Sequence, residues 1–186
     1  MNNAVQISAI SGVPDIKPGD KLDKILGECL EKSGGVREHD ILCVAHKVVS
    51  KAEGNLIKLS DVRPSKEANR YALELNKSPE KVEVILSQSK RVVRAFKHPR
   101  QNEGTMICEH KLGFISANAA VDESNSDFGT LITLPDAPDL SAKRLGESLE
   151  KRFGVTLGVV ITDTFGRPWR LGQVNVAIGP VSYTHL

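Results

Sequence analysis

The chain contains the run Val155-Thr-Leu-Gly-Val-Val-Ile161, which continues directly into Thr-Asp-Thr-Phe-Gly-Arg-Pro-Trp-Arg170. The first part is rich in β-branched residues and predicts a buried strand. The second part brings together an acid, two threonines, a glycine, two arginines and the only tryptophan of the chain. A rigid strand that delivers polar residues into a loop is a common way to build a functional site. We therefore expect a strand that ends near Ile161 and a polar loop after it.

Outward from this run, the sequence predicts a mixture of helices and strands. Apolar spacings of three and four, with Pro, Ser or Gly at the ends, predict helices after Asp20, over 65–75, over 79–88 and over 140–153. Apolar or alternating runs predict strands over 5–9, 41–45, 106–109 and 112–117. We expect Asp20 to cap the first helix and 118–130 to be a long polar loop. Because the elements do not alternate as strict βαβ units, the pattern favours an α+β fold with a mixed β-sheet and flanking helices.

Composition excludes several classes of protein. The chain has 186 residues, a net charge of +2 and 4% aromatic residues, which gives no electrostatic or stacking case for a nucleic-acid partner. Neither a signal peptide nor a membrane-spanning run is visible, so we expect no membrane partner. Its three cysteines, Cys29, Cys43 and Cys108, form no CxxC pair, which indicates a reducing, cytoplasmic location.

Polar segments follow three of the apolar runs, at 46–53, 118–125 and 163–170. If the strand ends converge, these segments form one polar site. Asp122 and Asp163 are then suited to a magnesium or manganese ion, because hard cations take oxygen ligands, and the Thr164 hydroxyl is a further donor. Aspartates are equally common as turn formers and helix caps, and from the residues alone the two interpretations stand about level.

Four basic side chains are candidates for an anion site. Lys47 and Lys51 are four residues apart, so on a helix they would share one face and repel each other mildly. That arrangement is tolerable if an anion lies between them, although a solvated lysine face is the commoner arrangement. Arg167 and Arg170 flank Trp169 and suit phosphate or carboxylate, whereas packing of the tryptophan with arginines around it is the alternative.

The histidines add little that is specific. His46 opens a polar segment and is a candidate ligand contact, while His110 follows a strand and is expected to be structural or on the surface. No signature of a covalent nucleophile is present. Lysines and arginines for phosphates with aspartates for a cation together indicate phosphoryl-transfer chemistry.

Four longer motifs carry a resemblance to a known family. They are Gly12-Val-Pro-Asp-Ile-Lys-Pro-Gly-Asp20, Ala45-His-Lys-Val-Val-Ser-Lys-Ala-Glu-Gly54, Asn118-Ala-Ala-Val-Asp-Glu-Ser-Asn125 and Ile161-Thr-Asp-Thr-Phe-Gly-Arg167. In this order, over about 5–179, the chain resembles the coenzyme F420-0:L-glutamate ligases, the F420 gamma-glutamyl ligase family.

The resemblance implies a GTP-dependent ligase that adds L-glutamate to coenzyme F420-0, and then a second, gamma-linked glutamate, through an acyl phosphate. It implies two sites for Mg²⁺ or Mn²⁺, help from K⁺, and an α+β fold that forms an intertwined homodimer. It also implies residue roles. Matched by motif, the GTP contacts are Val13, Pro14, Asp15, Ile16, His46, Lys47, Lys51 and Asn125. The metal ligands are Asp122, Asp163 and Thr164, and we count Asp122, Asp163 and Lys51 as catalytic. Arg167 and Arg170 are our own candidates for phosphate or glutamate.

Two departures from the family pattern stand out. Ala120 occupies a position where the family usually has glycine, so it is strained if that position needs a positive φ. After Gly179 the sequence does not follow the family, and we expect 1–179 to be a partial ligase domain, incomplete at its C-terminus, and 180–186 to be a non-native tail. Two alternatives stay open: the N-terminal ligase part of a bifunctional ligase and flavin reductase, and a non-catalytic remnant that binds nucleotide or metal.

Overall fold

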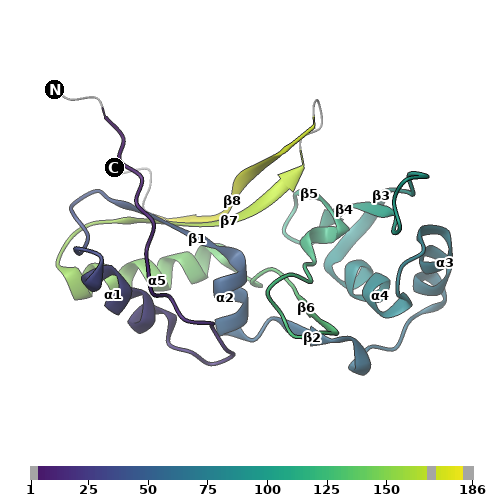
Figure 1. The fold of residues 1–186 in the computed structure, drawn as a ribbon, viewed down its shortest axis with the longest axis horizontal. Helices are drawn as coiled ribbons and strands as arrows, with labels where there is room; N and C mark the ends of the chain where they lie inside the picture. The colour runs from purple at the N-terminus through teal and green to yellow at the C-terminus, as the bar shows by residue number, and fades with distance from the viewer. Residues whose placement is uncertain (1–3, 167–170, 182–186) are drawn as a thin grey trace.

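The computed structural model describes residues 4–166 and 171–181, which form an elongated body with two halves (Figure 1). The helices are α1 (Leu22–Lys32), α2 (His46–Glu53), α3 (Lys66–Leu75), α4 (Pro79–Gln88) and α5 (Pro138–Phe153). The strands are β1 (Ile41–Ala45), β2 (Leu56–Lys58), β3 (Ser89–Phe96), β4 (Thr105–His110), β5 (Ile115–Ala117), β6 (Thr130–Ile132), β7 (Gly158–Gly166) and β8 (Gln173–Val181). Two 3₁₀ turns, η1 (Leu59–Asp61) and η2 (Asn118–Ala120), complete the set.

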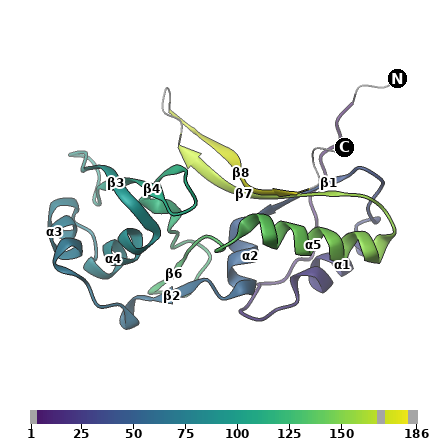
Figure 2. The same cartoon turned by 180° about the vertical axis from the view of Figure 1, so that it is seen from behind.

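One half is built on a mixed sheet in the order β1-β7-β8. Strand β1 runs parallel to β7, with Ala45 opposite Thr162, and β7 pairs antiparallel with β8. Helices α1 and α5 lie side by side along this sheet (Figures 1 and 2). Leu149 of α5 meets Val159 and Ile161 of β7 in a core where all three side chains are fully buried. The mixed sheet with flanking helices confirms the expected fold class.

The other half packs α3 and α4 against an antiparallel sheet in the order β3-β4-β5. Its core is separate from the first and includes Leu75, Val82, Ile85, Met106 and Cys108, all buried. A short ladder of β2 and β6 lies between the two halves (Figure 1). The chain segment after β5 therefore passes from one core to the other.

Local sequence signals explain the helix ends. Ser65 and Ser78 accept hydrogen bonds from the N–H groups of Ala68 and Lys81, as N-caps do. Gly154 ends α5 in the left-handed conformation that glycine adopts without strain. The four predicted helices are all confirmed, as are the strands at 41–45 and 106–109; the run at 112–117 is a strand only over β5.

Three local predictions are wrong. Residues 5–9 form no strand, and the side chains of Val5 and Ile7 are 89% and 92% exposed, because no other described segment supplies a ladder for them. Asp20 does not cap α1: its carboxylate accepts the Lys17 N–H at 2.8 Å and closes the turn before the helix. The expected loop after Ile161 is strand as far as Gly166, since β8 pairs with it residue by residue.

Candidate functional site

Helix α2 is the centre of the site, and it begins where β1 ends. Its N-cap, Ala45, has an extended backbone and provides no side-chain cap, and the first turn contains no acid. The uncapped start of a helix presents N–H donors and partial positive charge to whatever lies before it. Lys47 and Lys51 add two cationic side chains to the same helix. The segment therefore has the electrostatics of an anion site.

His46, the first residue of α2, faces Asp163 of β7. The imidazole is 2% exposed, and its Nε2 atom lies 3.3 Å from the Asp163 Oδ1 atom without a well-aligned hydrogen bond. On the other side of the ring, Nδ1 lies 3.3 Å from the hydroxyl of Ser50, one turn further along the helix. Asp163 also accepts the N–H of Thr164 at 2.7 Å. The parallel pairing of β1 and β7 causes this contact, since it places Thr162 opposite Ala45.

Lys47, the next residue, binds the loop that follows η2. Its Nζ atom lies 2.6 Å from the Asp122 Oδ2 atom and donates to the Ser124 hydroxyl. Asp122 Oδ1 accepts the Ser124 N–H at 2.6 Å, as in an Asx turn. Burial raises the pKa of Asp122, but the hydrogen bonds from Lys47 and Ser124 outweigh it, so the pKa is lowered overall. Asp122 is therefore an anion at neutral pH.

Lys51, one turn after Lys47, binds the first loop of the chain. Its Nζ atom lies 2.7 Å from Asp15 Oδ1, and this hydrogen bond lowers the pKa of the exposed Asp15 carboxyl. Ile16 next to it is buried at 5%, which anchors the loop to the body. A backbone bond from Gly19 N–H to Ala52 O, at 2.9 Å, fixes the same loop against α2. Each lysine thus has its own carboxylate partner.

Of the polar segments expected to converge, Asp163 and Asp122 both contact α2, through His46 and Lys47. Among the remaining candidates, Val13 packs on the first core, and Pro14 and Asn125 are exposed in their loops. The Thr164 hydroxyl donates to Asn175 Oδ1 on β8 at 3.0 Å. Arg167 and Arg170 lie outside the described residues, as does most of the tail expected at 180–186.

The loop that contains Asp122 is entered through an unusual backbone. Asn118, Ala119 and Ala120 all have positive φ, at 50°, 50° and 55°. Non-glycine residues pay a steric cost in this region, so the condition under which Ala120 is strained is met. Asn118 offsets part of this cost, because its side-chain oxygen accepts the Met106 N–H at 3.2 Å.

The site offers oxygen donors of the kind that Mg²⁺ and Mn²⁺ prefer, in Asp122, Asp163 and Thr164. Over 4–166 and 171–181, however, no group of three or more His, Cys, Asp or Glu side chains is arranged to hold a metal ion. The two carboxylates are therefore of the right chemical type for such a cation, but they are too few to complete its coordination shell. Such an ion would need donors from a bound phosphate and water.

Two serines that bind the site residues, Ser124 and Ser50, were not predicted from the sequence. Ser124 binds both Lys47 and Asp122, and its position two residues after an aspartate is the signal for an Asx turn that could have found it. Ser50 lies four residues after His46, the spacing at which helical side chains meet. His110, by contrast, is structural, as the sequence suggested. It is 3% exposed, accepts the Leu112 N–H and stacks on Phe114, and burial lowers its pKa.

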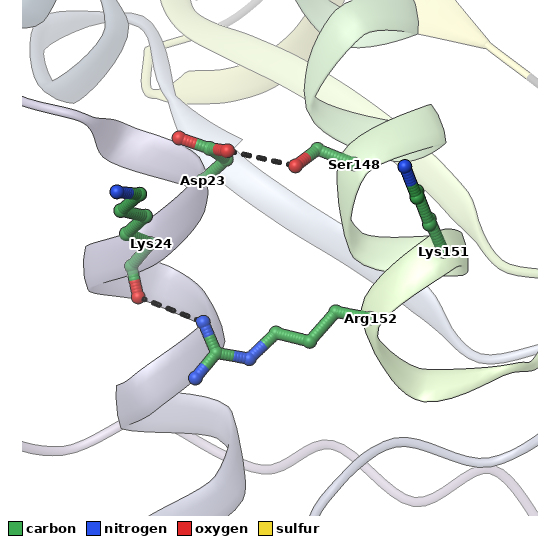
Figure 3. Close-up of a pocket in the computed structure, with 5 residues that line it drawn as sticks. All are labelled: Asp23, Lys24, Ser148, Lys151 and Arg152. Carbon is green, nitrogen blue, oxygen red and sulfur yellow. Dashed lines mark hydrogen bonds between the residues drawn. The ribbon is translucent and has the colours of Figure 1, made fainter.

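An open hollow between α1 and α5 is a second place to consider (Figure 3). Its lining residues are Asp23, Lys24, Ser148, Lys151 and Arg152. Ser148 donates to Asp23 at 2.7 Å, and Arg152 donates to the Lys24 carbonyl at 3.4 Å. These contacts hold the two helices together, so the hollow is better explained as a polar helix contact than as an active site.

In the described part of the chain, no helix has the length and apolar character needed to cross a membrane.

Comparison with known proteins gives a consistent result. The sequence model of a family described as "F420-0:Gamma-glutamyl ligase" matches residues 12–184. A protein named "Coenzyme F420:L-glutamate ligase" from Methanopyrus kandleri is 44% identical over 164 residues, which are 88% of this chain and 61% of that protein. Proteins of the same name from Methanothermobacter thermautotrophicus and Methanosarcina mazei are 37% and 36% identical, over 94% and 92% of this chain and 68% and 63% of their own lengths. The chain thus spans about three-fifths to two-thirds of these relatives.

Proposed function

The chain belongs to the F420-0:gamma-glutamyl ligase family, and we propose that it takes part in GTP-dependent attachment of L-glutamate to coenzyme F420-0. The observation that carries the proposal is the convergence of three distant segments on α2, through His46, Lys47 and Lys51. The names of the relatives support the acceptor and the amino acid. The use of GTP is what the resemblance implies, and the two lysines of α2 support it as groups able to bind phosphate.

The γ-phosphate of GTP fits the start of α2 for three reasons. Uncapped helix N–H groups favour an anion, and Lys47 and Lys51 supply positive charge on the same helix. The His46 Nε2 atom lies 3.3 Å from Asp163 Oδ1, which keeps a carboxylate that would hold a metal ion beside the same helix start. On phosphate binding, we expect the lysines to exchange part of their contact with Asp122 and Asp15 for phosphate oxygens.

The reaction proposed has two steps. A carboxylate oxygen of F420-0 attacks the γ-phosphorus of GTP, and the bond between this phosphorus and the β-phosphate oxygen breaks. GDP departs, and the product is an acyl phosphate. The glutamate amine then attacks the acyl carbon, the carbon–oxygen bond to phosphate breaks, and the amine loses a proton as inorganic phosphate departs. Lys47 and Lys51 stabilise negative charge on the transferred group in the first step.

Asp122, Asp163 and Thr164 are the residues that would hold Mg²⁺ or Mn²⁺, with GTP phosphates and water as the other ligands. The bound ion would supply neutralisation of phosphate charge. The dependence on K⁺ and the homodimer remain predictions from the resemblance.

Mass spectrometry of F420-0 incubated with the purified protein, L-glutamate, GTP and Mg²⁺ tests the proposal. We expect a product heavier by one glutamyl residue and release of phosphate in equal amount. ATP in place of GTP is the control for the nucleotide. Phosphate release without any glutamylated product would refute the acceptor, and glutamylation that proceeds without nucleotide would refute the mechanism.

A further inference from the structure

The loop containing Asp122 is bound from two sides by ion pairs on consecutive residues. Asp122 pairs with Lys47 of α2, while Glu123, the next residue, has its Oε1 atom 2.8 Å from Lys81 Nζ on α4. Helix α2 packs on the first core and α4 belongs to the second. The two ion pairs therefore connect one short loop to both halves of the molecule.

Lys81 is an unusual residue to find in this place. It lies in the first turn of α4, where the helix dipole disfavours a cation, and its side chain is only 11% exposed. Burial acts to lower its pKa, but hydrogen bonds to Glu123 and Glu103 outweigh burial and the pKa is raised. A lysine that is desolvated and set against a helix dipole needs firm carboxylate partners.

Glu103 makes Lys81 part of a network of four charges. Its Oε2 atom lies 2.9 Å from both Lys81 Nζ and Lys77 Nζ, and the Lys77 side chain is 3% exposed. Lys77 precedes α4 in the turn after α3, and Glu103 lies between β3 and β4. The network thus fixes Lys81 within the α3–α4 half. The ion pair between Lys81 and Glu123 therefore holds the loop against that half of the molecule.

The backbone of Asp122 is held by two hydrogen bonds with Ile132, at 3.0 and 2.8 Å, whereas the loop after Asp122 relies on side-chain contacts. The loop also has an unfavourable backbone conformation. It is entered through the three left-handed residues of η2, and Asn125 within it also has a positive φ, of 61°. Conformations of this kind persist only where the surroundings enforce them. The Ser126 hydroxyl provides one internal restraint, because its single proton is shared between the carbonyls of Glu123 and Thr130, at 2.9 and 2.7 Å.

We propose that Lys81 is a positioning residue that sets the place of Asp122, and with it nucleotide binding, through its ion pair with Glu123. This inference rests on the proposed function as far as the nucleotide is concerned. Neither Lys81 nor Glu123 is proposed to touch the substrate. The ion pair fixes Glu123 relative to the α3–α4 half, and Asp122 is the residue next to Glu123 in the chain.

The test compares Lys81→Met with Lys77→Met. Both remove one largely buried lysine from Glu103, but only the first removes the partner of Glu123. Hydrogen exchange of the backbone over 121–127 measures the loop directly, and calorimetry measures the Kd for GTP with Mg²⁺. For Lys81→Met we expect faster exchange in the loop and a Kd raised about tenfold, the scale seen when residues supporting a site are removed. For Lys77→Met, which leaves the pair between Lys81 and Glu123 in place, we expect smaller changes in both quantities.

Glu123→Gln guards against misfolding of the lysine variants, because Glu123 is 52% exposed. It should reproduce the faster exchange and weaker binding, and Lys81→Arg should restore both toward the wild type. Equal behaviour of Lys81→Met and Lys77→Met, or an unchanged loop in Glu123→Gln, would overturn the inference. If the wild type binds no GTP, the proposed function fails, while the exchange data still decide whether Lys81 holds the loop.

Discussion

Replacement of Lys47 by methionine tests the contact between α2 and the Asp122 loop. The change keeps most of the aliphatic stem and removes the ammonium group that lies 2.6 Å from Asp122 Oδ2. A hydrogen bond between charged groups contributes about 1.5–3 kcal/mol. Because the side chains of Lys47 and Asp122 are 28% and 29% exposed, water replaces part of the contact. We therefore expect a loss of about 1.5 kcal/mol in the free energy of unfolding, near the lower end of that range.

The pH dependence of this loss gives a second, independent readout. The pKa of Asp122 is lowered in the folded protein below its ordinary value of 3.8. A lowered pKa gives stability that is fully present above the unfolded pKa and is lost as the pH falls through the folded pKa. The penalty of Lys47→Met should therefore be full at about pH 7 and shrink below about pH 4.

Urea unfolding at several pH values measures both effects. Lys143→Met is the matched control, because Lys143 is 60% exposed and its only described ion pair, with Glu147, is 3.8 Å long. It should change the free energy of unfolding by less than about 0.5 kcal/mol. A Lys47 variant no less stable than the Lys143 variant, or a penalty that does not change with pH, would show that the Asp122 contact is not what the geometry indicates.

Two further predictions concern binding and folding. Lys51→Ala should weaken GTP binding more at low than at high salt, because the lost charge is screened by ions, and equal losses in calorimetry at both salt concentrations would argue against a phosphate contact. Gly179→Ala should destabilise the protein by about 1–3 kcal/mol, because its Cβ would lie 2.5 Å from backbone atoms of Pro138. Gly166→Ala in the same hairpin meets nothing within 4 Å and should be neutral in thermal melting, so a similar loss in both variants would contradict the packing argument.

Four of the five α-helices in the described residues were predicted, because their signals are local, whereas α2 was not. Ser78 and Pro79 at the start of α4, and Gly154 at the end of α5, specify the helix ends with little help from distant residues. Strand pairing is not local, and β2, β3, β6 and β8 were not predicted. The same reason explains the error after Ile161: alternation within the segment does not reveal that β8 returns to pair with it.

For the candidate site too, local features were predictable from the sequence and contacts between distant residues were not. The residue types of Asp122, Asp163 and the two lysines were visible from the sequence, but which carboxylate each lysine contacts was not. That outcome depends on β1 running parallel to β7 and on the left-handed turn of η2. The pair between Lys81 and Glu123 joins residues 42 positions apart on different elements, and no sequence pattern indicates it.

The most direct test of the account is calorimetric titration of GTP with Mg²⁺ into the wild-type protein and into Asp163→Asn. Asparagine keeps an oxygen that can accept the Thr164 N–H, so the fold and the melting temperature should be preserved. We predict saturable binding to the wild type and binding at least about tenfold weaker to the variant. Equal affinities in the two proteins, or no binding to a folded wild type, would contradict the assignment of a GTP site to the start of α2.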